Sequence, residues 1–208
     1  MQAVTIKYKT VGPWKENSYC VQYKDQAFLV DPGDEFELLE NEFNTKNLKI
    51  YGILSTHGHF DHIGAVSEFK NKYELPFYLH SKDKQILRQA NLYKKLAGKS
   101  GVFETPSVDF FLDDISELKL GEEIVKIHHT PGHTNGSVCF ELGNNLLSGD
   151  LLFKDAIGRV DLPGGNSVLL AQSIQYVINN FMGYMIFPGH GLPFNLTETE
   201  ARHLKSLI

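Results

Sequence analysis

Short apolar runs separated by turn residues dominate the first quarter of the sequence. Runs of four to eight apolar and β-branched residues, bounded by Gly, Pro, Asn and Asp, are typical of β-strands. They predict strands at 4–8, 18–23, 27–30 and 50–55. Phe36, Leu39 and Phe43 recur instead at helical spacing, which predicts a helix over 35–43. Strands followed by a helix and a further strand predict a layered α/β fold with some antiparallel pairing.

The remaining sequence continues this alternation of strands and helices. Apolar residues at spacings of three and four after His62 predict a helix that reaches Tyr73. A helix is also expected over 81–96, with Ser81 as its N-cap. The segment 98–114 is irregular and reads as a loop or flap near the site. Further strands are predicted at 76–79, 123–129, 137–141, 145–148 and 184–187, and further helices at 167–180 and 197–208.

Residues 55–64, STHGHFDHIG, concentrate metal-binding side chains directly after the strand at 50–55. His57, His59, Asp61 and His62 supply three imidazoles and one carboxylate, a set that suits zinc, iron or manganese. Alternate residues of an extended segment share one face, so the spacing predicts that His57, His59 and Asp61 point together. A metal site is therefore the first functional hypothesis.

Three more candidate ligands follow later strands. His133 lies in the turn TPGHT after 123–129, Asp150 follows 145–148, and His190 lies in PGHG after 184–187. Sheets of this class place their sites at the carboxyl ends of strands, so these residues are expected to converge with the 55–64 segment. The other central histidines, His80, His128 and His129, lack such a placement and are interpreted as structural or rim residues.

Length, charge and cysteine content exclude several classes of protein. A chain of 208 residues fits a single domain spanning 1–208. A net charge of −5 without a basic run argues against a nucleic-acid partner, and the absence of an apolar stretch of 18 residues argues against a membrane span. Residues 1–9 alternate like a strand and do not resemble a signal peptide. Cys20 and Cys139 are isolated, which favours a reduced, cytoplasmic setting.

Taken together, THGHFDH, TPGHT, SGD and PGHG, in this order at strand ends, resemble the metallo-β-lactamase superfamily over nearly the whole chain. The resemblance implies a four-layered αβ/βα sandwich, with mixed sheets, outer helices and a dinuclear metal site at one edge. The nearest branch is similar to glyoxalase II, the hydroxyacylglutathione hydrolases. Residues 158–165, GRVDLPGG, resemble its short single-domain members.

The resemblance also implies roles for the candidate residues. One metal would be held by His57, His59 and His133, and the other by Asp61, His62 and His190, with Asp150 bridging. Two divalent ions per chain are expected, zinc first, with iron or manganese as alternatives. A hydroxide bridging the ions would attack a small-molecule acyl thioester or related ester, oriented by the catalytic residue Asp61. Arg159 would contact substrate at the rim, or else pair with Asp161 to fix its loop.

Other functions share parts of this pattern. Persulfide dioxygenases, which the sequence also resembles, bind one iron, here on His57, His133 and Asp150; the loop at 162–165 favours the hydrolases. A nuclease would be expected to have a basic surface, and a flavodiiron domain a glutamate at the position of His59. A non-catalytic metal-binding domain would be expected to have lost ligands, and none is missing. Only 18 residues follow His190, so the helical domain that binds glutathione in full-length glyoxalase II is not expected, and glutathione recognition and oligomeric state stay open.

Overall fold

The computed structural model describes residues 4–208, so residues 1–3 of the alternating segment 1–9 lie outside the described part. Within it, strands form two six-stranded sheets and one two-stranded sheet. The first sheet contains β1 (Thr5–Val11), β2 (Glu16–Tyr23), β3 (Gln26–Val30), β4 (Lys49–Leu54), β5 (Phe77–Leu79) and β6 (Phe110–Phe111), in that order. The second runs β14 (Phe194–Asn195), β13 (Met185–Pro188), β10 (Asn145–Gly149), β9 (Val138–Leu142), β8 (Glu123–His129) and β7 (Glu117–Leu120). The small sheet pairs β11 (Leu152–Phe153) with β12 (Ala156–Ile157).

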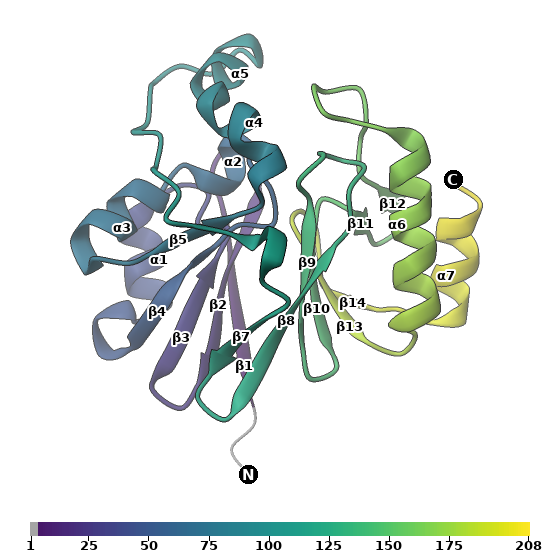
Figure 1. Ribbon diagram of the computed structural model, residues 1–208, viewed down its shortest axis with the longest axis horizontal. Helices are drawn as coiled ribbons and strands as arrows, with labels where there is room; N and C mark the ends of the chain where they lie inside the picture. The colour runs from purple at the N-terminus through teal and green to yellow at the C-terminus, as the bar shows by residue number, and fades with distance from the viewer. Residues whose placement is uncertain (1–3) are drawn as a thin grey trace.

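Helices cover the outer faces of both sheets and the upper edge of the first (Figure 1). On the first sheet lie α1 (Phe36–Glu42) and α3 (Val66–Tyr73), and at its upper edge α2 (Phe60–Ile63), α4 (Lys84–Arg88) and α5 (Ala90–Leu96). On the second lie α6 (Ser167–Asn180) and α7 (Glu198–Lys205). Short 3-10 turns occupy Thr45–Asn47, Ser81–Asp83 and Leu112–Asp114. No helix within 4–208 is long and apolar enough to cross a membrane.

Alternating side chains on the central strands divide the core into three hydrophobic clusters, which lie between the layers of helices and sheets. On β3, Phe28 and Val30 pack between the sheets, whereas Ala27 and Leu29 face the outer helices. On the other side of the molecule, the inner face of α6 joins α7 and the second sheet in its own cluster. Each fully buried Phe, Leu or Val contributes roughly 1.5–3 kcal/mol of transfer free energy. The predicted four-layered αβ/βα sandwich is confirmed.

The pairing directions explain why loops converge at one edge. In the first sheet β1–β2–β3 are antiparallel, whereas β3 to β6 are parallel to their neighbours. In the second sheet β10 and β13 are parallel. The carboxyl ends of β4, β10 and β13 therefore each release a loop that carries candidate ligands. The predicted helix at 167–180 matches α6, and the predicted strands at 123–129 and 145–148 match β8 and β10 to within one residue.

The single helix expected over 81–96 is wrong. The chain forms a 3-10 turn, then α4, then α5, which are separated at Gln89. Ser81 is not the N-cap, because its hydroxyl donates to the Asp113 carboxylate. His80 caps the turn instead, since its Nδ1 accepts from the Lys82 backbone N–H at 3.3 Å.

The segment after His57 also differs from the expectation. The chain is extended only through His59, and α2 begins at Phe60, so Asp61 and His62 lie in one helical turn. The alternation of an extended chain predicted that Asp61 points with His57 and His59. This prediction is wrong, because Asp61 lies in the helical turn. Strand β7 was not anticipated although Glu117–Leu120 alternates in burial, and the two-residue strands β6, β11, β12 and β14 are too short to leave a sequence pattern.

Candidate metal centre

The seven predicted ligands meet at the edge where the loops of both sheets converge. His57 and His59 follow β4, Asp61 and His62 lie on α2, His133 follows β8, Asp150 follows β10, and His190 follows β13. The four histidines 57, 59, 62 and 133 are buried, whereas Asp61, Asp150 and His190 keep side-chain exposures of 17, 12 and 26 %. Solvent and small ligands therefore reach this centre from the side of Asp61 and His190.

Three imidazoles form the first ligand group. The Nδ1 atom of His59 lies 3.1 Å from His57 Nε2 and 2.9 Å from His133 Nε2. The remaining nitrogens of His57 and His133 face oxygen acceptors: Thr56 Oγ1 at 3.1 Å and the Arg159 carbonyl at 2.8 Å. Those contacts assign the ring protons to Nδ1 and turn both Nε2 lone pairs toward His59. Converging lone pairs of this kind are the donor set of a tetrahedral metal site.

The second ligand group combines Asp61, His62 and His190. His190 Nε2 lies 3.5 Å from Asp61 Oδ2, and the ligand atoms of the three residues lie within 4.8 Å of one another. Asp150 stands between the two groups: its Oδ1 is 3.4 Å from His62 Nε2, and its Oδ2 is 3.5 Å from both His133 Nε2 and His190 Nε2. A carboxylate placed in this way can bridge two cations.

Unpartnered buried atoms support the fit to metal ions. His62 Nε2 and Asp150 Oδ1 are buried and have no hydrogen-bond partner among the described residues. Leaving such groups unsatisfied costs about 1–3 kcal/mol each, and more for a charged group. Cations between these atoms would satisfy both. The chemistry of the donors and their burial therefore suit the two divalent ions that the sequence suggested.

Asp31 is a supporting residue that sequence reasoning missed. Its buried carboxylate accepts from His62 Nδ1 at 3.0 Å, from the Thr56 hydroxyl at 2.6 Å and from the Thr56 N–H at 2.7 Å. Thus Asp31 orients His62 directly and His57 through Thr56, the role that outer carboxylates play at metal-binding histidines. The tetrapeptide DPGD at 31–34 predicted only a turn, and no ligand spacing marked its first residue.

Gly33, in the turn at 31–34, packs against the chain around α2 with no space for a side chain. A Cβ on Gly64 would lie 2.2 Å from the Gly33 carbonyl oxygen, and a Cβ on Gly33 would lie 1.9 Å from that of Asp61. Glycine is required at both positions because backbone meets backbone. This close packing at Gly33 and Gly64 fixes Asp61 and His62 relative to Asp31.

Burial and neighbouring carboxylates shift the pKa values of histidines in the two groups in opposite directions. Burial lowers the pKa of His57 well below 6.5 and that of His59 to about 3. For His62 and His190 burial acts in the same direction, but Asp150 outweighs it, together with Asp31 beside His62 and Asp61 beside His190. The pKa of His62 is thus raised well above 6.5 and that of His190 to about 10. Without metal, the His62 and His190 imidazoles are protonated at neutral pH, whereas those of His57 and His59 are neutral.

This difference predicts proton-linked metal binding. Loading the second group at pH 7 is expected to release protons from His62 and His190, because only neutral imidazole binds a metal. Its affinity should fall steadily as pH decreases from about 10. His57 and His59 should release none. Calorimetric zinc titration of metal-free protein in buffers of different ionisation enthalpy measures the protons released at each step. Equal release at both steps would contradict the assignment.

The other singled-out residues lie outside this centre. Arg159 and Asp161 form an exposed bidentate ion pair with both N···O distances at 2.7 Å, which matches the alternative that they fix their loop. His80 stacks on His129 with ring centroids 4.3 Å apart, and His128 contacts Glu141 at 2.8 Å. Both cysteines are buried and free, and burial raises the pKa of each thiol to about 12, so neither is a nucleophile at neutral pH.

Comparison with known proteins agrees with this geometry. The sequence profile of the metallo-beta-lactamase superfamily matches residues 11–190, which include all seven ligand candidates. The chain belongs to the metallo-β-lactamase superfamily. Members of this superfamily bind metal ions, and the His/Asp cluster occupies the position where the two sheets meet.

Three similar members of the superfamily carry informative names. The probable metallo-hydrolase YqgX of Bacillus subtilis is 35 % identical over 87 % of each chain. The hydroxyacylglutathione hydrolase GloC of Haemophilus influenzae is 33 % identical over 79 % of this chain and 80 % of its own. The crystal structure of TTHA1623 in a di-iron-bound form is 35 % identical, with a TM-score of 0.86 over 97 % of this chain and all of that chain. Similarity to the glyoxalase II branch, expected from the motifs, is confirmed by GloC.

Proposed function

We propose that the protein is a dinuclear metallo-hydrolase that cleaves acyl thioesters or related acyl esters. The observation that carries the proposal is the pair of ligand groups that share Asp150, with His62 Nε2 and Asp150 Oδ1 unpartnered between them. His57, His59 and His133 would hold one ion, and Asp61, His62 and His190 the other. Zinc is the expected metal; the di-iron form of the similar TTHA1623 makes iron the principal alternative.

The chemistry of two bound divalent ions is the generation of a hydroxide near neutral pH and the polarisation of a carbonyl oxygen. The protein residues have separate tasks. Asp150 holds the two groups at a fixed separation, while Asp31 and the Arg159 carbonyl keep His62 and His133 in the required tautomers. No serine or cysteine is required as nucleophile.

Asp61 is the residue proposed to orient the attacking water. Its carboxylate is partly exposed, on the open side of the centre beside His190. Burial raises the pKa of Asp61, but the hydrogen bond from His190 and the charge of His62 outweigh burial and lower it below 3.8. The carboxylate is therefore ionised at neutral pH and accepts a hydrogen bond from water without taking the proton. The Arg159 carbonyl orients His133; its exposed guanidinium, which the ion pair with Asp161 holds in place, is proposed to contact the substrate at the rim.

Thioesters are proposed as substrates because of similarity to GloC, named a hydroxyacylglutathione hydrolase, together with the GRVDLPGG loop. The test is a panel of four compounds: an S-hydroxyacyl glutathione, the acetyl thioester of N-acetylcysteamine, its oxygen-ester analogue, and a chromogenic β-lactam. We expect thioester kcat/KM on the order of 10⁴ M⁻¹ s⁻¹ or higher, and weaker turnover of the others. A chelator should abolish thioester turnover. A fully metal-loaded protein that cleaves none of the four would contradict the proposal and favour a non-catalytic metal-binding domain.

A further inference from the structure

A small, partly open pocket of about 50 Å³ adjoins the metal centre on the side of Asp61. The loop between β1 and β2, the helix α2, and the segment from α5 to Phe103 form its walls. Asp61 belongs to both the pocket and the second ligand group. Trp14 also connects them, because its side chain lines the pocket while its carbonyl accepts from His190 Nδ1 at 3.0 Å. A ligand that occupies the pocket is therefore within reach of the reaction centre.

Two lysines supply the positive charge of this pocket. The Nζ atom of Lys99 lies 5.7 Å from the centre of the Trp14 ring, and that of Lys94 lies 5.4 Å from the centre of the Phe103 ring. Among residues 4–208 neither lysine forms a salt bridge, whereas Lys70 and others pair with carboxylates. Contact with an aromatic face holds an ammonium group in place without neutralising it. Both side chains are half-buried, so the two charges act in a partly desolvated space.

The acidic residues of the pocket limit how much negative charge it accepts. In the metal-loaded protein Asp61 would bind the second ion, which would compensate its charge. Asp34 also lines the pocket, and its Oδ1 accepts from the Glu35 N–H at 2.8 Å. Against Lys94 and Lys99 this leaves a net positive pocket that suits one singly charged anion. Trp14, Phe60 and Phe103 provide apolar contact for the chain that bears the anion.

We propose that this pocket binds a carboxylate carried by the substrate at a distance from the scissile bond, with Lys94 and Lys99 as the residues that select it. The proposal rests on the proposed function for the reacting end of the substrate. The lysines would donate to the carboxylate, and the aromatic rings would pack against the connecting chain. It makes carboxylate-bearing thioesters preferred over neutral ones.

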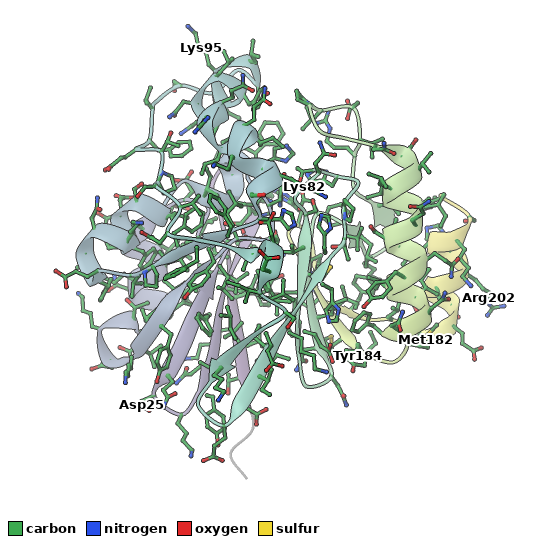
Figure 2. All side chains as sticks on the ribbon, in the orientation of Figure 1. Asp25, Lys82, Lys95, Met182, Tyr184 and Arg202 are labelled. Carbon is green, nitrogen blue, oxygen red and sulfur yellow. The ribbon has the colours of Figure 1, made fainter. Side chains whose placement is uncertain are left out.

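The chain provides its own reporter and its own control. Trp14 is the only tryptophan, so intrinsic tryptophan fluorescence measures ligand binding in the pocket. Lys95 follows Lys94 on α5, but it is exposed and its side chain extends from the outer end of the helix away from the sheets (Figure 2). The Lys94→Gln/Lys99→Gln double variant therefore removes the pocket charges, and Lys95→Gln removes a charge of the same helix that does not line the pocket.

The probe is 3-(benzylthio)propionate, a thioether that cannot be hydrolysed, compared with its neutral amide. In the metal-loaded protein we expect the carboxylate to change Trp14 fluorescence with a Kd at least tenfold below that of the amide. The double variant should lose this preference, and Lys95→Gln should keep it. Equal affinities for acid and amide, or an unchanged preference in the double variant, would overturn the proposal. A carboxylate that bound only at the metals would give the second of these results.

Turnover separates this inference from the proposed function. The thioester of acetate with 3-mercaptopropionate is compared with that of 3-mercaptopropanamide. We expect a KM at least tenfold lower for the acid in the wild type and in Lys95→Gln, but not in the double variant. If neither thioester is cleaved but the carboxylate preference in binding persists, the hydrolase proposal fails and the pocket assignment stands. If both are cleaved with equal KM, the pocket assignment fails and the hydrolase proposal stands.

Discussion

Replacing Asp150 by asparagine is expected to lower turnover by roughly 10³-fold and metal content to one ion per chain or fewer. Asparagine keeps the shape of the side chain but removes the negative charge that stands between the two ligand groups. Asp150 contacts His62, His133 and His190 at 3.4–3.5 Å, so its carboxylate reaches both groups. Elemental analysis and steady-state kinetics on the thioester panel measure the two effects.

Asp155→Asn is the matched control, because Asp155 is exposed five residues further along the chain and its side chain is outside the centre. Asparagine also tolerates the left-handed backbone that Asp155 adopts, with φ of 65°. This variant should keep both ions and full turnover. An Asp150→Asn protein that retains two ions and wild-type turnover would remove Asp150 from the bridging role.

Gly189→Ala is expected to disturb the same centre through packing alone. A Cβ at this position would lie 2.2 Å from Asp150 Oδ1 and 2.7 Å from His62 Cε1. Both atoms belong to the centre, so the added methyl group must displace Asp150 or the His190 loop. Overpacking of this kind costs roughly 1–3 kcal/mol in stability. We expect loss of the second ion and a fall in turnover of at least about 10²-fold.

Gly183→Ala separates this local effect from general destabilisation. Gly183 has φ of +85° and open space around it, so alanine there is strained but collides with nothing. Its cost is about 1–2 kcal/mol. Both variants should lower the thermal midpoint, but only Gly189→Ala should lose metal. Equal metal content in the two variants would contradict the geometry of the centre.

The sequence predicted the convergence of the candidate ligands because their positions follow from local rules. Strands that end in a histidine or aspartate, such as β10 before Asp150 and β13 before His190, release that residue at the same sheet edge. The helix at 167–180 followed from helical periodicity: Leu170, Ile174 and Val177 recur at spacings of four and three and are all buried. These features depend on the order of residues and on strand direction, which a sequence contains.

The features that the sequence did not reveal depend on contacts between distant residues. Asp31 orients His62 across 31 positions, and nothing in its own neighbourhood marks that role. Asp61 was placed with His57 and His59 by alternation, but α2 begins at Phe60 and turns it to His190 instead. The role of the pocket lysines could not be predicted from the sequence either, because Lys94 and Lys95 differ only in the side of α5 on which they lie.

The central claim is a centre that holds two metal ions and hydrolyses a thioester. The most direct measurement is metal content per chain by elemental analysis of protein purified without added metal, together with oxygen uptake during incubation with glutathione persulfide. We expect close to two ions per chain, from the two groups that share Asp150, and no oxygen uptake. A single iron per chain with oxygen consumption would contradict the account and identify a persulfide dioxygenase that uses His57, His133 and Asp150.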